Sequence, residues 1–156
     1  KRQPSVIELV KKSGYPGMKI LQFAFDSREE SDYLPHNYTH NCVVYTGTHD
    51  NDTVMGWYDT LKGADKKLCD DYLRLKNADG EPIPREQLPW EFVRAAMSSV
   101  ADLAIIPMQD YLGLGSEARI NIPSTLGINW KWRMGNGDFT KELAGRIRSM
   151  TKLYGR

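Results

Sequence analysis

Cysteine is scarce in this sequence. Cys42 and Cys69 are the two cysteines among 156 residues, one in a predicted strand and the other in a predicted helix. Small secreted scaffolds that depend on disulfides carry a much larger share of cysteine. We therefore expect both thiols to be reduced, and the composition excludes a disulfide framework.

Long apolar runs and an excess of one charge are also missing. No stretch approaches the roughly 20 apolar residues that span a bilayer, and the first residues, Lys1 to Pro4, lack the apolar centre of a signal peptide. The 21 Lys and Arg side chains nearly balance 20 Asp and Glu, a net charge of +1, so nothing marks a nucleic-acid surface. We expect a cytoplasmic protein whose partners include no membrane and no nucleic acid.

The composition that remains is that of one ordinary globular domain, with 40% hydrophobic and 26% charged residues. Apolar runs predict strands over 18–25, 42–47 and 103–107, and amphipathic patterns predict helices over 4–13, 53–61, 65–75, 89–100 and 139–154. The stretch 26–41 is a predicted loop, and residues 109–137 are predicted to be irregular. Buried strands joined by crossovers are typical of a parallel sheet covered by helices, so the expected fold class is α/β.

Polar side chains crowd at the end of the second predicted strand, in the turn His49-Asp50-Asn51-Asp52. The carboxyl ends of strands are where α/β enzymes place their chemistry. An imidazole beside a carboxylate suits the binding of vicinal sugar hydroxyls. The alternative for Asp50 is an N-cap of the helix that begins near Thr53. Asn51 and Asp52 are expected either to orient the His-Asp pair or to cap that helix.

Two other kinds of site are excluded by the sequence. A calcium loop fails because Val54 and Met55 stand where an oxygen donor and a glycine are required, and no zinc spacing of Cys and His exists. The Gly-rich stretch 113–118 imitates a dinucleotide fingerprint, but no amphipathic helix opens there and Pro123 soon follows. We therefore expect no metal and no cofactor.

Five blocks of sequence carry a resemblance to a known family. They are Gly14–Asp26, Leu34–Tyr38, Tyr45–Thr53 followed by Gly56-Trp57, Gln109–Asn121, and the segment ending Asn129–Arg133. The central block reads Tyr-Thr-Gly-Thr-His-Asp-Asn-Asp-Thr. In residues, order and spacing these blocks resemble the 4-alpha-glucanotransferases, the family also called amylomaltase or disproportionating enzyme.

The resemblance implies a (β/α)8 TIM-type barrel, which takes about 250 residues. A chain of 156 residues is too short for one. Residues 1–156 are therefore expected to be a partial catalytic domain, the C-terminal portion of the barrel with about three β/α units. The expected partner is the remaining N-terminal part of the same barrel, which would carry the nucleophile and the acid/base before Lys1.

The activity that the resemblance implies is transfer of alpha-1,4-glucan segments between maltooligosaccharides or onto glucose, by retaining double displacement without a cofactor. Asp50 would stabilise the transition state and His49 would hydrogen-bond the same sugar. Two alternatives stay open: a related alpha-glucan hydrolase, and a non-catalytic glucan-binding fragment. The location would be the plastid stroma if the source is a plant.

Further side chains are expected to contact substrate. The predicted substrate-binding residues are Asn51, Asp52, Gln22, Phe23, Phe25 and Asn121. For Phe23 and Phe25 simple core packing has equal weight, because alternate residues of a strand fill the core. Trp57, Trp130 and Trp132 present the same choice, with a structural role favoured for Trp57, and His36 is a weaker candidate near the site.

Overall fold

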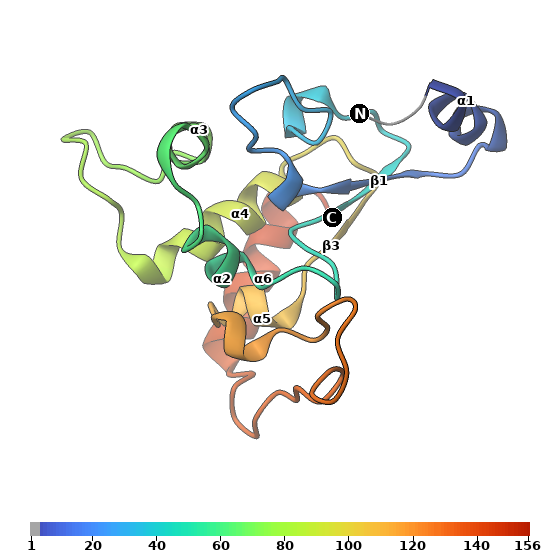
Figure 1. Cartoon of the computed structure of the whole chain (residues 1–156). Helices are drawn as coiled ribbons and strands as arrows, with labels where there is room; N and C mark the ends of the chain where they lie inside the picture. Colours follow the sequence, from blue (N-terminus) through green and yellow to red (C-terminus); the bar gives the residue numbers. More distant parts are fainter. Residues whose placement is uncertain (1–3) are drawn as a thin grey trace.

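Residues 4–156 are described by a computed structural model, in which three parallel strands form one sheet (Figure 1). The strands are β1 (Gly17–Ile20), β2 (Cys42–Tyr45) and β3 (Leu103–Ile105), in the spatial order β1-β2-β3. Val44 is aligned with Lys19 on one side and with Ala104 on the other. The predicted α/β class with a parallel sheet is confirmed. Lys1–Gln3, which entered the argument about a signal peptide, lie outside the described residues.

Each of the five predicted helices has a counterpart; the helix predicted over 4–13 has the predicted ends, and the other four have shifted ends. The α-helices are α1 (Pro4–Ser13), α2 (Val54–Tyr58), α3 (Gly63–Tyr72), α4 (Leu88–Met97), α5 (Met108–Tyr111) and α6 (Lys141–Leu153), and the 3-10 turns are η1 (Leu21–Phe23), η2 (Pro35–Asn37), η3 (Arg85–Gln87) and η4 (Ser116–Ala118). Of these, α5 and η4 fall where irregular structure was expected. No helix among the described residues is long and apolar enough to cross a membrane.

The first strand is shorter than the sequence predicts. Strand β1 ends at Ile20, and the amide of Ala24 donates to the carbonyl of Leu21 in the turn η1. Leu21 and Ala24 are fully buried. A short apolar run has the same appearance whether it continues a strand or forms a buried turn, which is why the prediction extended the strand to Phe25.

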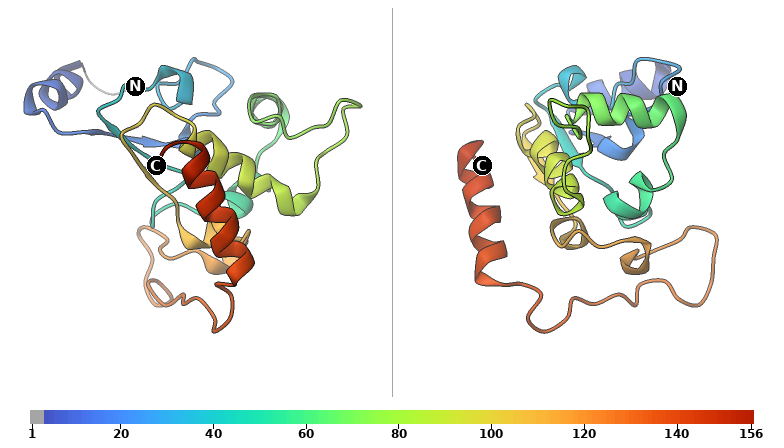
Figure 2. Two further views of the ribbon diagram at one scale, coloured as in Figure 1. Left: turned by 180° about the vertical axis from the view of Figure 1, so that it is seen from behind. Right: turned by 90° about the vertical axis from the view of Figure 1, so that its left-hand side faces the viewer.

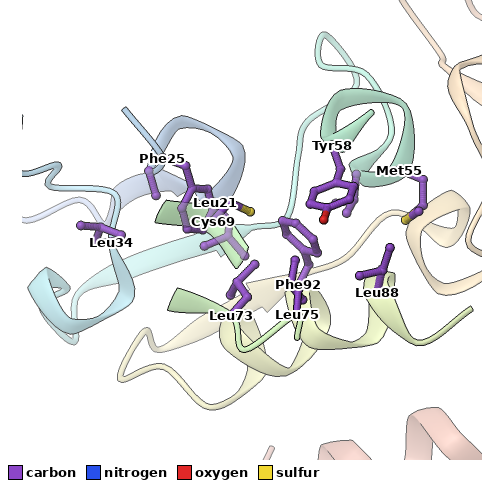
Figure 3. Close-up of a cluster of buried hydrophobic side chains, with 12 residues drawn as sticks. Leu21, Phe25, Leu34, Met55, Tyr58, Cys69, Leu73, Leu75, Leu88 and Phe92 are labelled. Carbon is purple, nitrogen blue, oxygen red and sulfur yellow. The ribbon is translucent and has the colours of Figure 1, made fainter. Parts of the chain in front are cut away.

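Helix α4 is the centre of the core, because its side chains enter three apolar clusters. Phe92 packs among residues of η1, α2 and α3, as Figure 3 shows. Ala96 packs on Cys42 and Val44 of β2. Val93 belongs to the cluster that includes Met150 of α6, and α6 contacts α4, beside which it lies in the right-hand view of Figure 2. Helix α4 thus joins the sheet to the C-terminal helix.

Both outer strands of the sheet carry exposed apolar side chains. Met18 of β1 is 48% exposed, and Leu103 and Ile105 of β3 are 51% and 42% exposed. Strands β1 and β3 each pair with β2 alone among the described residues, so each leaves an edge to which further chain can pair. The sheet is therefore open at both sides.

Candidate active site

The carboxyl ends of the three strands meet at one edge of the sheet. The turn after β2 lies between the segments that follow β1 and β3, because β2 is the central strand. The side-chain amide of Gln22, just after β1, donates to the main-chain carbonyl of Asp52 at 2.8 Å. On the other side, Asp110 of α5 accepts hydrogen bonds from the Thr46 hydroxyl and from the amide of Val54. In Figure 1 the orange segment that follows α5 comes close to the teal chain of the turn, and hydrogen bonds join the two. The turn is thus held from both neighbouring strands.

His49, Asp50 and Asn121, three of the predicted site residues, lie in contact with one another. The Nε2 atom of His49 lies 3.3 Å from Oδ1 of Asp50, and Nδ2 of Asn121 donates to the same oxygen at 2.7 Å. The side chains of His49 and Asp50 are 53% and 50% exposed. A carboxylate with one oxygen fixed and half of its surface open is arranged to receive a polar ligand.

Arg119 was not identified from the sequence, although it stands two residues before Asn121. Its Nη2 donates to the main-chain carbonyl of Asp50 at 2.7 Å, and its Nε donates to the carbonyl of Asn121 at 2.9 Å. The amide of Asn121 in turn donates to the carbonyl of His49 at 3.1 Å. These bonds fasten the segment after η4 to the main chain of the His-Asp turn.

The capping alternative for Asp50 is wrong, because Thr53 is the N-cap of α2. The Thr53 hydroxyl accepts a hydrogen bond from the amide of Gly56 at 3.1 Å, which is the bond that an N-cap supplies. Asn51 and Asp52 are not caps of α2 either. Asn51 Oδ1 accepts from the amide and the hydroxyl of Thr48, both at 2.8 Å, and closes the turn.

Asp52 links the turn to η4. One carboxylate oxygen accepts from the amide of Thr53 at 2.8 Å, and the other accepts from the hydroxyl of Ser116 at 2.6 Å. Gly56 makes this possible, because a Cβ there would stand 2.7 Å from both oxygens of Asp52. Asp52 therefore has a demonstrable part in holding the turn.

The predicted residues after β1 separate into three environments. Gln22 is 5% exposed and its amide is bonded to the turn. Phe23 is 48% exposed and meets Tyr33 edge to face, with ring centroids 5.6 Å apart. Phe25 is 4% exposed and packs against Trp57 and Phe92. The expectation that Phe25 contacts substrate is corrected, since the chain turns at η1 and directs this ring into the core.

The remaining aromatic candidates also differ. Trp57 packs against the core cluster, in agreement with the structural role favoured for it. Trp130 is 56% exposed, and its ring centroid lies 5.0 Å from that of His49. Nδ1 of His36 lies 3.0 Å from the hydroxyl of Tyr72. Trp130 is thus the tryptophan seen in contact with the His-Asp turn.

A small cavity of about 30 Å³ lies between the turn and the segment after β3. Thr48 and Asn51 line it from the turn, and Gln109 and Arg119 line it from the other side. This volume is large enough for one water molecule, which needs polar partners of this kind. No group of three or more His, Cys, Asp or Glu side chains suited to a metal ion exists within residues 4–156.

Asp110 is the buried carboxyl of the site, and sequence reasoning missed its role. It is 2% exposed. Burial raises the pKa of Asp110 to about 6, although the hydrogen bonds from Thr46 and Val54 act in the opposite direction. Because Thr46 and Val54 bracket the His-Asp turn, Asp110 ties together both ends of the segment that carries it.

We expect the stability that Asp110 contributes to fall as the pH rises. Its pKa in the folded chain, about 6, is above the ordinary value of 3.8, so the contribution is fully present below about pH 4 and is lost as the pH passes 6. A shift of about two pKa units corresponds to about 3 kcal/mol. Relative to Asp110→Asn, which does not titrate, the free energy of unfolding of the wild type should decline by about that amount between pH 4 and pH 7.

Urea unfolding followed by tryptophan fluorescence at several pH values measures this difference. The variant Asp79→Asn is the control, because it removes the same charge from an exposed loop position. If the difference between wild type and Asp110→Asn does not change with pH, the carboxyl of Asp110 does not titrate in this range.

Comparisons with known proteins agree with the sequence blocks. A family model described as 4-alpha-glucanotransferase matches residues 2–138. The chain is 49% identical over 151 residues to the 4-alpha-glucanotransferase of Clostridium butyricum, covering 96% of this chain and 30% of that protein. It is 46% identical over 154 residues to the chloroplastic/amyloplastic 4-alpha-glucanotransferase of Arabidopsis thaliana, covering 97% of this chain and 26% of that protein. The chain thus spans less than a third of the length of these curated relatives.

Solved structures give the same result. An amylomaltase from Streptococcus agalactiae, solved in complex with acarbose, matches with a TM-score of 0.89 and 34% identity, covering 100% of this chain and 30% of that one. An amylomaltase from Corynebacterium glutamicum matches with a TM-score of 0.69 over 97% of this chain and 27% of that one. At 13% identity the second match concerns the fold alone.

Proposed function

The chain belongs to the 4-alpha-glucanotransferase family, and from this premise we propose that it forms part of an enzyme that transfers alpha-1,4-glucan segments between maltooligosaccharides or onto glucose. The reaction would be a retaining double displacement. In the first step an enzyme carboxylate attacks the anomeric carbon while an acid group protonates the departing oxygen. In the second step the hydroxyl of an acceptor sugar attacks the same carbon and displaces the carboxylate, while the former acid group, now a base, takes the proton of that hydroxyl. No cofactor enters these steps.

The observation that carries the proposal is the arrangement of Asp50. Its carboxylate is half exposed at the carboxyl edge of a parallel sheet, with one oxygen held by Asn121 and His49. Charge of oxocarbenium character develops on the sugar in the transition state. A fixed carboxylate beside that ring stabilises this charge and binds the hydroxyls next to the reacting carbon, while His49 bonds the same sugar.

We assign the other predicted residues to two roles, contact with the glucan and support of the His-Asp turn. Asn121 and the exposed ring of Phe23 would line the glucan path. Asn51, Asp52 and Gln22 would hold the turn, which their hydrogen bonds support. Phe25 is not among the proposed substrate contacts, because its ring is buried in the core.

We propose that residues 1–156 are the C-terminal portion, about three β/α units, of a (β/α)8 barrel. The open edges of β1 and β3 support pairing with further strands, the remaining N-terminal part of the same barrel. The nucleophile and the acid/base would lie in the part of the relatives' length that this chain does not match. The location would be the cytoplasm, or the plastid stroma if the source is a plant.

A full-length enzyme that carries this chain tests the activity. It is made by replacing the matching segment of the Clostridium butyricum relative with residues 1–156, and it is called the carrier enzyme below. Incubated with maltotriose, the carrier enzyme should release glucose and build chains longer than maltotriose, because an acceptor sugar and not water takes the glucan segment. Chromatography of the products separates these species.

The competing function is hydrolysis of alpha-glucans. A hydrolase would give glucose and maltose with no product longer than the substrate. That outcome in the carrier enzyme, with transfer intact in the unmodified Clostridium butyricum protein, would overturn the transferase proposal for this chain.

A further inference from the structure

The guanidinium of Arg119 donates hydrogen bonds to main-chain carbonyls of the His-Asp turn and of the segment beside it. Nη2 reaches the carbonyl of Asp50 at 2.7 Å and Nε reaches the carbonyl of Asn121 at 2.9 Å. Arg119 is partly buried. An arginine used only for solubility would point its charge into water, so these two bonds indicate a role within the fold.

The bonds of Arg119 and Asn121 close a ring around Asp50. Asn121 donates from its side chain to Oδ1 of Asp50 at 2.7 Å and from its amide to the carbonyl of His49 at 3.1 Å. Arg119 holds the carbonyls of both Asp50 and Asn121. The main chain and the carboxylate of Asp50 are therefore fixed by one short segment that is 69 residues away along the chain.

Arginine suits this position for a geometric reason. Its planar fork presents several N–H groups at fixed angles, so it can hold two separate carbonyls at once, whereas lysine carries one compact, mobile ammonium group. Glutamine at this position is shorter and carries no charge. The guanidinium therefore joins the carbonyls of Asp50 and Asn121 and also fixes the distance between them.

We propose that Arg119 is a positioning residue for Asp50, which fixes the direction of the catalytic carboxylate through the Asp50 carbonyl and through Asn121. This inference rests on the proposed function, because Asp50 must act in the reaction for its direction to matter. A displacement of about 1 Å at a catalytic group lowers rates by about 10². As a positioning residue, Arg119 would act through Asp50 and would not itself contact the substrate.

The test is a double-mutant cycle in the carrier enzyme, with total cleavage of maltotriose as the rate, so that transfer and hydrolysis count alike. Arg119→Gln should lower kcat by about 10- to 100-fold with KM changed by less than about threefold. Arg119→Lys should fall between Arg119→Gln and wild type. In the Asp50→Asn background, Arg119→Gln should lower kcat by less than about twofold further, because the group it positions has been disabled.

Arg156 provides the matched control. Its guanidinium also ends on main-chain carbonyls, those of Met97, Ser99 and Ala101, at 2.8, 2.9 and 2.7 Å. Arg156→Gln should lower the melting temperature and leave kcat within about twofold of wild type. This separates a loss of stability from a loss of positioning.

Two results would overturn the role of Arg119. One is a kcat for Arg119→Gln and Arg119→Lys that equals that of Arg156→Gln. The other is a multiplicative cycle, in which Arg119→Gln lowers kcat by the same factor with and without the Asp50 carboxylate. Failure of the proposed function is distinct, since it shows in the unsubstituted carrier enzyme as the absence of products longer than maltotriose.

Discussion

Asp50→Asn in the carrier enzyme is expected to lower kcat for maltotriose by about 10² to 10³-fold, the usual loss when one preorganised stabilising group is removed. Asparagine keeps the size of the side chain and an oxygen that accepts from Asn121. It lacks the negative charge that faces the developing positive charge of the sugar. Because that charge is small in the ground state, KM should change far less than kcat. Initial rates over a range of maltotriose concentrations measure both constants.

Asp138→Asn is the matched control for this substitution. Asp138 lies in an exposed loop, where its carboxylate accepts from the amide of Gly135. The change in charge and size is the same, and kcat should stay within about twofold of wild type. Turnover of Asp50→Asn that is equally close to normal would show that Asp50 takes no part in the transition state. Helix capping would not explain its presence, because Thr53 already caps α2.

Local pattern was enough to predict the elements that carry the turn. The apolar run Cys42–Tyr45 forms β2, and the polar residues directly after it form the turn that holds Asp50. Apolar runs separated by crossovers predict parallel pairing, and the three strands of the structure are parallel. These features depend on residues near one another in the chain, where periodicity and composition carry the information.

The supports of the turn depend on contacts that no local pattern encodes. Thr46 and Asp110 are 64 residues apart in sequence, and Asp50 and Arg119 are 69 apart. Both supporting residues stand in a block that resembles the family, but the block does not state which groups they bond. A pattern of charged residues cannot distinguish an arginine that holds a carbonyl from one that faces water. Long-range partners become visible when the chain is folded.

Phe23 and Phe25 show a second limit of sequence reasoning. They are two residues apart, so a continuous strand would place both rings on one face of the sheet. The turn η1 breaks that alternation, leaving Phe23 exposed and Phe25 in the core. The turn results from burial of Leu21 and Ala24, a tertiary effect that overrides the local preference for a strand.

Residues 1–156 alone are expected to show no glucan transfer. Retaining transfer needs two carboxyl groups about 5 to 5.5 Å apart, one as nucleophile and one as acid/base. Around Asp50, both oxygens of Asp52 accept hydrogen bonds, and Asp110 is buried with both oxygens bonded. Neither presents an oxygen free to attack an anomeric carbon. Under the proposed function, the described part of the site would stabilise charge without breaking the glycosidic bond.

Two other carboxyls come into question, those of Asp26 and Glu117. The guanidinium of Arg28 lowers the pKa of Asp26 to about 2 through hydrogen bonds, and a general acid needs a pKa near the operating pH. Glu117 accepts from the amide of Gly115 at 2.9 Å. Neither Asp26 nor Glu117 stands in the sequence context that the family resemblance implies for the nucleophile or the acid/base.

The assay is maltotriose incubated with the purified 156-residue chain, its mass verified and its folded state checked by circular dichroism. The carrier enzyme at equal concentration is the positive control, and products are counted by chromatography. Weak binding of maltooligosaccharide without turnover agrees with the expectation, since Asp50, His49 and Asn121 remain in place. A tenfold difference in turnover corresponds to only about 1.4 kcal/mol in the barrier. If the 156-residue chain turns over maltotriose within about tenfold of the carrier enzyme, the nucleophile and the acid/base lie within this chain, and their assignment to the rest of the barrel is refuted.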